Sequence, residues 1–131
     1  MRDGVGQEVQ RELIRAGKSL AAAKALLKEG LLEDSLSRSY YAVLHAARAL
    51  LIGEGFAPQS HEAVKRLFGL HLVNTGKLDT HHAHILREAQ DDRALADYDV
   101  AFVPQEERVR QRVSNAELFV TEALRFLGLE T

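Results

Sequence analysis

One helix-forming stretch, residues 37–51, carries a line of side chains that could bind a phosphate and move a proton. At about 100° per residue, Arg38, Tyr41 and His45 fall on one side of that helix. A guanidinium group can contact a phosphate through two nitrogens, and an imidazole can exchange a proton near neutral pH. Such residues inside a helix also often form a polar seam whose members satisfy one another. The spacing therefore leaves both a phosphate pocket and a structural seam open.

A second group lies near the end of another predicted helix, where Arg93 and Asp97 stand four residues apart and Tyr98 follows. At this spacing the guanidinium and the carboxylate can meet across one helical turn. An exposed pair of this kind contributes only about 0.3–0.5 kcal/mol to stability, so the aromatic neighbour at the helix end favours a further role. The pair is either a plain local ion pair that needs no function, or it positions the following loop or contacts an RNA phosphate.

Two other clusters contain residues that could bind ions. Ser60 is expected to cap a helix whose first residue, His61, could donate an N–H group to an anion bound there. His81, His84 and Glu88 could share one helix face as metal ligands, but they lack the His-Glu-x-x-His pattern that specifies both a base and its ligands. We expect the histidines of residues 81–84 to be solvated, and we predict neither a metal site nor a cofactor.

Adjacent acidic residues form a further pattern. Glu33 with Asp34, and Asp91 and Asp92 with Asp97, look like paired catalytic carboxylates. The sequence shows no aromatic-lined sugar cleft or partner ligand to accompany either pair. We therefore expect both pairs to lie on solvated helix faces or near helix starts, where carboxylates are favourable.

The hydrophobic pattern places all of these residues on or beside helices. Apolar side chains recur at spacings of three and four, and no stretch shows the alternation of a β-strand. The central stretch is apolar on nearly every face, so other helices must cover it on several sides. We predict an all-α, up-and-down bundle of four main helices with an additional short helix. The helices should span about residues 9–27, 34–52, 60–73, 80–94 and 105–127.

Length and composition limit the classes of function. The chain has 131 residues, 46% apolar and 27% charged, which suits one globular domain over residues 1–131 with a core from about 8 to 128. Its net charge of −2 argues against a surface built for broad nucleic-acid binding, although cations can cluster locally. The lack of cysteine excludes disulfides and thiolate chemistry. With no apolar run near roughly 18 residues and no signal-peptide pattern, we expect a cytoplasmic protein without a membrane span.

Four pieces of sequence together resemble a known family. They lie in the central helix, at the start of the third helix, just after that helix and at the end of the fourth: 38-RSYYAVLHAARALL-51, Ser60-His61, 74-NTGKL-78 and 93-RALADY-98. Over roughly residues 10–127 the chain resembles the small stand-alone HEPN-domain proteins of bacteria and archaea. That resemblance implies an up-and-down helical bundle, usually a homodimer. It also implies a minimal nucleotidyltransferase encoded beside it, in a toxin–antitoxin-type pair.

Many HEPN proteins are metal-independent ribonucleases that use an arginine and a histidine a few residues apart, near the dimer interface. After Arg93, the positions where the histidine would stand are residues 98–100, and they hold Tyr-Asp-Val. The chain departs from the catalytic pattern at this point. Two other pairs have a suitable spacing, Arg38 with His45 and Arg66 with His71. In a chain with this many arginines and histidines, such matches are expected by chance.

We therefore expect a dimeric HEPN-like module that acts with a nucleotidyltransferase and contacts RNA or a nucleotide. His45 is the candidate proton carrier and Arg93 the candidate for stabilising a phosphate, while the expected RNA contacts are Arg38, Tyr41, His61, Asp97 and Tyr98. These groups should converge in an accessible groove. Two alternatives stay open: an active metal-independent endoribonuclease, and a purely structural subunit whose polar seam only holds the helices in register.

Overall fold

The computed structural model describes residues 3–129, which form helices joined by turns and loops. In chain order the elements are α1 (Asp3–Lys28), α2 (Leu32–Gly53), α3 (His61–Phe68), the π-helical turn η1 (Gly69–Val73), α4 (Thr80–Tyr98) and α5 (Glu106–Phe126). No strand occurs among these residues, and the predicted all-α bundle is confirmed. Within the same residues, no helix is long and apolar enough to cross a membrane.

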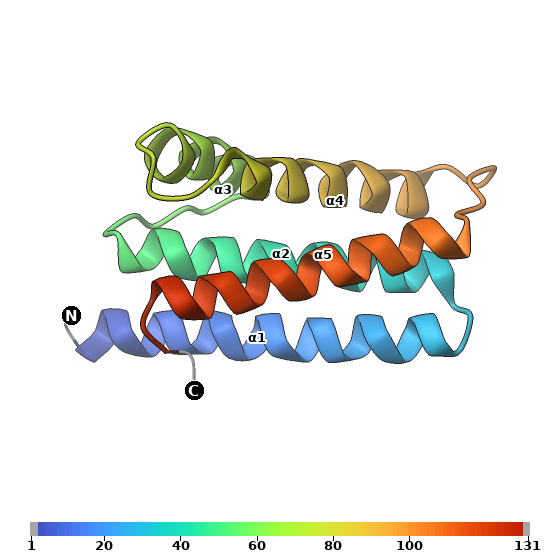
Figure 1. Cartoon of the computed structure of the whole chain (residues 1–131), viewed down its shortest axis with the longest axis horizontal. Helices are drawn as coiled ribbons and strands as arrows, with labels where there is room; N and C mark the ends of the chain where they lie inside the picture. The colour runs from blue at the N-terminus through green and yellow to red at the C-terminus, as the bar shows by residue number, and fades with distance from the viewer. Residues whose placement is uncertain (1–2, 130–131) are drawn as a thin grey trace.

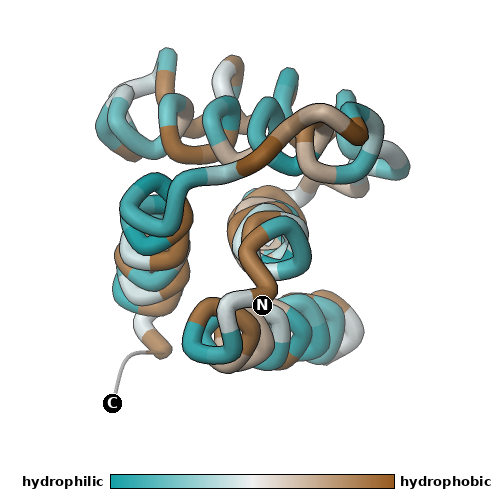
Figure 2. Tube along the Cα trace, turned by 90° about the vertical axis from the view of Figure 1, so that its right-hand side faces the viewer, coloured by the Kyte–Doolittle hydropathy of each residue, from teal (hydrophilic) through white to brown (hydrophobic). Residues whose placement is uncertain are grey.

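Helix α2 occupies the centre of the bundle (Figure 1). The four long helices run in alternating directions along one axis, and α2 packs against α1, α5 and the layer formed by α3 and α4 (Figures 1 and 2). Thirteen of the 22 residues of α2 are buried, so the enclosed central helix predicted from the sequence is confirmed. Polar side chains on α2 are therefore confined to the few directions in which no other helix covers it.

Small side chains let α1 and α2 pack closely. Ala16 and Ala23 on α1 are fully buried, as are several alanines of α2, and short side chains permit a short distance between helix axes. Ser35 joins the two helices where they meet, because its Oγ donates a hydrogen bond of 2.8 Å to the carbonyl of Ala23. Gly30, with φ of +77°, supplies the left-handed residue that ends α1. The chain turns there, and α2 runs antiparallel to α1, as the predicted up-and-down bundle requires.

The third helix is shorter than the sequence pattern predicts. The pattern indicates one helix up to about Val73, whereas α3 ends at Phe68 and η1 follows, beginning at Gly69. Glycine is a weak α-helix former, and it allows the backbone to open into the wider π-helical turn. The start of α3 agrees with the prediction, because the Oγ of Ser60 accepts a hydrogen bond of 3.0 Å from the amide of Ala63.

Helix α4 is longer than predicted. It continues past Ala94, where the sequence pattern ends it, as far as Tyr98, so Tyr98 belongs to the helix and not to the following loop. Ala96 packs against the apolar cluster beneath the α1–α2 turn, which holds this last part of the helix in place. An ion pair of 2.9 Å between Arg93 and Asp97 spans one turn of the extension. Both residues therefore have fixed positions on a helix.

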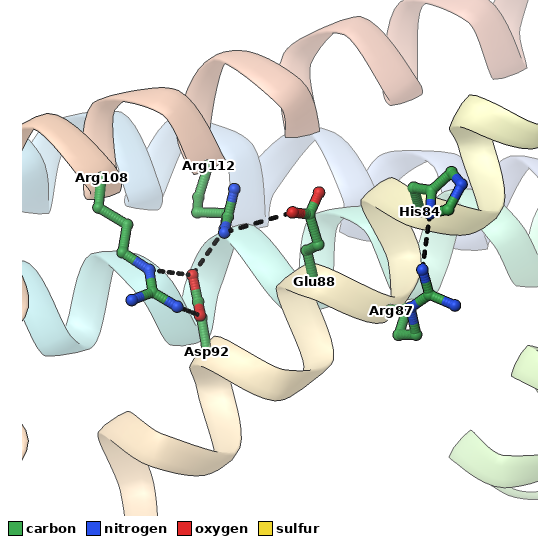
Figure 3. Close-up of polar contacts among 6 residues, drawn as sticks. All are labelled: His84, Arg87, Glu88, Asp92, Arg108 and Arg112. Atoms are coloured by element: carbon green, nitrogen blue, oxygen red, sulfur yellow. Dashed lines mark hydrogen bonds and ion pairs between the residues drawn. The ribbon is translucent and has the colours of Figure 1, made fainter.

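A buried ion cluster joins α4 to α5 (Figure 3). The side chain of Asp92 is only 2% exposed, and its carboxylate lies 2.6 Å from Nε of Arg112 and 2.5 Å from Nη2 of Arg108. Arg112 also lies 3.6 Å from Glu88. The expectation that Asp92 lies on a solvated face is therefore wrong. Two arginines of α5 neutralise its charge inside the interface, a partnership that α4 alone does not reveal.

The histidines near the start of α4 make separate contacts. His82 is buried, with Nε2 2.8 Å from a carboxylate oxygen of Glu122, so the expectation of a solvated side chain is wrong here. His84 lies on the surface beside Arg87 (Figure 3). Across residues 3–129, no group of three or more histidine or acidic side chains is placed to hold a metal ion.

Candidate functional site

A groove with a volume of about 820 Å³ lies between α1 and α2. Its lining comes from both helices and consists of Arg11, Ile14, Arg15, Lys18, Ser19, Ala22, Arg38, Tyr41 and His45. Four of these side chains are cationic and none is a carboxylate. Positive charge is thus concentrated in one groove of a chain whose net charge is −2, and such a surface attracts anions.

The α1 side of this groove is absent from the sequence prediction. Arg11, Arg15 and Lys18 follow one another at spacings of four and three, which places them on one helix face. That spacing is a signal that could have been found in the sequence. The antiparallel packing of α1 on α2 then brings this cationic face next to Arg38 and His45, and spacing within either helix does not indicate that juxtaposition.

His45 is held by a carboxylate of the neighbouring helix. Its Nδ1 lies 2.7 Å from Oε2 of Glu12, and both side chains are mostly buried, at 16% and 15% exposure. The other oxygen of Glu12 lies 3.7 Å from Nε of Arg48. An ionised carboxylate can only accept hydrogen bonds, so Nδ1 of the imidazole carries a proton. Nε2 is then the ring nitrogen that Glu12 does not contact, and His45 is part of the groove lining.

Arg93 lies against Tyr41 from the opposite side, on α4. Its Nη2 donates a hydrogen bond of 3.1 Å to Oη of Tyr41, and its Nε lies 2.9 Å from Asp97. Burial, the largest single influence, lowers the pKa of Arg93, but the Tyr41 hydrogen bond and the Asp97 carboxylate outweigh it, so the pKa is raised. The guanidinium therefore stays charged. Its carbon Cζ also lies 5.5–5.8 Å from the ring centres of Tyr40, Tyr41 and Tyr98.

His61, the first residue of α3, completes this cluster. Its ring centre lies 5.7 Å from that of Tyr40 and 6.0 Å from that of Tyr41. Burial lowers the pKa of His61, and the positive charge of Arg93 lowers it further, so the imidazole is neutral at pH 7. Burial raises the pKa of Tyr40 to about 12, and this phenol stays protonated. Neither side chain contributes a charge to the site near neutral pH.

The sequence-predicted residues thus gather around Tyr41, but on two sides of it. Arg38, whose Cζ lies 5.6 Å from the ring centre of Tyr41, lines the groove with Tyr41 and His45. The remaining four, which come from α3 and α4, are not part of the groove lining: His61, Arg93, Asp97 and Tyr98. Tyr98 is 76% exposed at the end of α4, and Asp97 accepts a hydrogen bond of 2.8 Å from Oγ of Ser37.

Comparison with known proteins gives relatives over most of the chain. The profile of the HEPN domain matches residues 9–126. A "UPF0332 protein" of Pyrococcus horikoshii is 41% identical over 91 residues, which cover 70% of this chain and 64% of that protein, somewhat under two thirds of its length. A "Putative toxin" of Methanocaldococcus jannaschii is 34% identical over 88% of this chain and 86% of its own. A second protein of that organism with the same designation is 26% identical over 92% of this chain and 82% of its own.

The extent of these matches agrees with the structure. The HEPN profile begins in α1 and ends at the last residue of α5, so it includes both walls of the groove and the Arg93 cluster. The resemblance inferred from the central helix and the Arg-x-x-x-Asp-Tyr element is confirmed. The chain belongs to the HEPN domain family.

Proposed function

We propose that this protein is a toxin-like HEPN module that binds RNA in the groove between α1 and α2. The groove carries the proposal, because four cationic side chains and no carboxylate line it. Phosphate contacts supply much of the affinity of proteins for nucleic acids. The names of the two Methanocaldococcus relatives support the assignment to a toxin class.

The dimensions of the groove suit a short run of nucleotides. From Arg11 to Lys18 the rise along α1 is about 10 Å, enough for guanidinium and ammonium groups to reach successive phosphates. Ile14 and Tyr41 add apolar and aromatic surface among the cations. Bases of single-stranded RNA stack on such surfaces, and stacking tolerates any base. We therefore assign the phosphates to the cationic side chains and a base to Tyr41.

We further propose that the protein forms a homodimer and acts with a nucleotidyltransferase, as the HEPN resemblance implies. The connection between α4 and α5 supports a protein interface, because Val100 and Val103 expose apolar side chains next to Tyr98. Exposed apolar clusters beside a site are typical of interaction surfaces. This surface adjoins the Arg93 cluster and is separate from the groove lining.

Co-expression with a minimal nucleotidyltransferase, the partner that the HEPN resemblance implies, tests the partner assignment. We expect the tagged protein to retain its partner through affinity purification. The double substitution Val100→Asp and Val103→Asp should lower recovery of the partner at least tenfold, because it places charges in an apolar interface. Leu70→Asp is the matched control, since Leu70 is exposed on η1. Equal recovery with the control and the double variant would exclude this loop as the interface.

A second candidate function, metal-independent RNA cleavage, is favoured by the pairing of His45 with Glu12. A neutral imidazole nitrogen could accept the proton of a ribose 2′-hydroxyl, and a nearby arginine could stabilise charge on the phosphorus oxygens. Arg38 lines the groove, and Arg93 adds its charge from behind Tyr41. On this proposal His45 is the general base and Arg93 the electrostatic stabiliser.

Incubating the protein with single-stranded RNA in EDTA tests cleavage. We expect His45→Ala and Arg93→Ala each to reduce the cleavage rate about 100-fold or more, since general base and charge stabilisation each contribute effects of that size. His84→Ala and Arg87→Ala remove the same residue types from the exposed face of α4 and should leave the rate unchanged. If the wild-type protein leaves RNA intact at every concentration, the chain is an RNA-binding module without this activity.

A further inference from the structure

We propose that Glu12 and His45 make the groove prefer a ribose phosphate chain over a deoxyribose one, with Glu12 as the positioning residue. The inference rests on the proposed RNA contact in the groove. It adds a specificity determinant and assigns a role to Glu12, which is not part of the groove lining.

The groove lining is rich in hydrogen-bond donors. Arginine and lysine side chains donate only, so Arg11, Arg15, Lys18 and Arg38 recognise the phosphate oxygens that RNA and DNA share. The hydroxyl of Tyr41 already accepts from Arg93, and Ser19 is almost fully buried. A ribose 2′-hydroxyl, which deoxyribose lacks, can both donate and accept a hydrogen bond. The phosphate oxygens compete for the donors of the groove, so an acceptor is the group that can recognise the 2′-hydroxyl without binding phosphate as well.

Nε2 of His45 supplies that acceptor only while the ring proton stays on Nδ1. Glu12 enforces this arrangement, because its carboxylate lies 2.7 Å from Nδ1 and can only accept a hydrogen bond. Arg48 stands 3.7 Å from the other oxygen of Glu12 and helps to hold the carboxylate in place. Both members of the pair are mostly buried. An Nε2 atom fixed in this way accepts a hydrogen bond from the 2′-hydroxyl at little cost in conformational freedom.

Matched oligomers of uridine and 2′-deoxyuridine test the preference, because they differ only in the 2′-hydroxyl. Binding is measured by fluorescence anisotropy at pH 8 in EDTA, well above the ordinary pKa of imidazole, about 6.5. We expect wild-type protein to bind oligouridine about 2- to 13-fold more tightly, the ratio that one neutral hydrogen bond supplies. His45→Leu should bring the ratio to about 1 by weakening oligouridine alone. If His45 has only a structural role, His45→Leu should weaken the binding of both oligomers equally.

Glu12→Gln tests the positioning role. A glutamine amide can accept from Nδ1 or donate to it, so both imidazole tautomers become possible. We expect the ratio to fall between the wild-type value and 1, and nitrogen-15 NMR should show Nε2–H in the variant but Nδ1–H in the wild type. Glu8→Gln removes an exposed negative charge one turn earlier on α1 and should change neither result. In the wild type, oligouridine should shift the Nε2 resonance of His45 and oligodeoxyuridine should not.

Four outcomes would overturn the inference. Equal affinity of the wild-type protein for both oligomers would do so while leaving the groove as a phosphate-binding site. A preference retained in His45→Leu, or an unchanged tautomer in Glu12→Gln, would remove the assigned roles of His45 and Glu12. Failure of the wild-type protein to bind either oligomer would instead refute the proposed RNA contact, and this inference with it.

Discussion

Replacing Asp92 with alanine should lower the free energy of unfolding by about 3 kcal/mol and the melting temperature by about 10 °C. The substitution removes a carboxylate that is 2% exposed and leaves two arginines of α5 without their main partner. Arg112, at 12% exposure, cannot turn fully into water and keeps only Glu88, 3.6 Å away. Arg108 is 44% exposed and can be hydrated. For this reason we place the effect at the lower end of the range for a broken buried ion pair.

Urea denaturation followed by circular dichroism measures this effect. Asp91→Ala is the matched control, because Asp91 precedes Asp92 on α4 but is exposed; a surface change of this kind should stay within about 0.5 kcal/mol. If both variants unfold at the same urea concentration, the cluster shown in Figure 3 does not stabilise the α4–α5 interface. The difference between the two variants thus isolates the buried carboxylate.

Asp92 also shows why the sequence predicted the helices better than the contacts between them. Apolar periodicity is a property of one helix, so it revealed the bundle and the enclosed position of α2. The burial of Asp92 depends on arginines 16 and 20 residues further along, on a different helix. His82 with Glu122 is a similar case. Neither partner can be identified from spacing, because many polar residues of α5 could face α4 equally well.

The same distinction, between residues of one helix and contacts between helices, applies to the candidate site. Arg38, Tyr41 and His45 could be grouped from the sequence, because they lie on one side of one helix. The contact of Arg93 with Tyr41 joins two helices, so the spacing within either helix does not predict it. Only the family resemblance indicated that these two residues belong to one site. The partner of His45, Glu12, is 33 residues away on α1 and went unrecognised. The net charge of −2 likewise gave no sign of the cationic cluster in the groove, because net charge does not say where the charged side chains lie.

The α1 wall of the groove should carry much of the affinity for RNA. The triple variant Arg11→Gln, Arg15→Gln and Lys18→Gln should bind a single-stranded RNA oligomer about 100-fold more weakly at 0.1 M salt. The logarithmic dependence of affinity on salt should lose about 2 units of slope, since each phosphate contact on a single strand contributes about 0.7. All three side chains are exposed, so the stability of the fold should not change. Fluorescence anisotropy at several salt concentrations measures both quantities.

A second triple variant separates the groove from net charge as the cause of binding. Lys65→Gln, Arg66→Gln and Arg87→Gln change the net charge equally, but these residues lie on α3 and α4 and do not line the groove. If RNA binds in the groove, this control should lose less than about threefold, because these side chains do not line the groove and salt at 0.1 M screens charges that make no direct contact. Equal losses in both variants would mean that RNA responds to overall charge alone. A loss of affinity confined to the α1 variant would place the RNA phosphates in the groove beside His45.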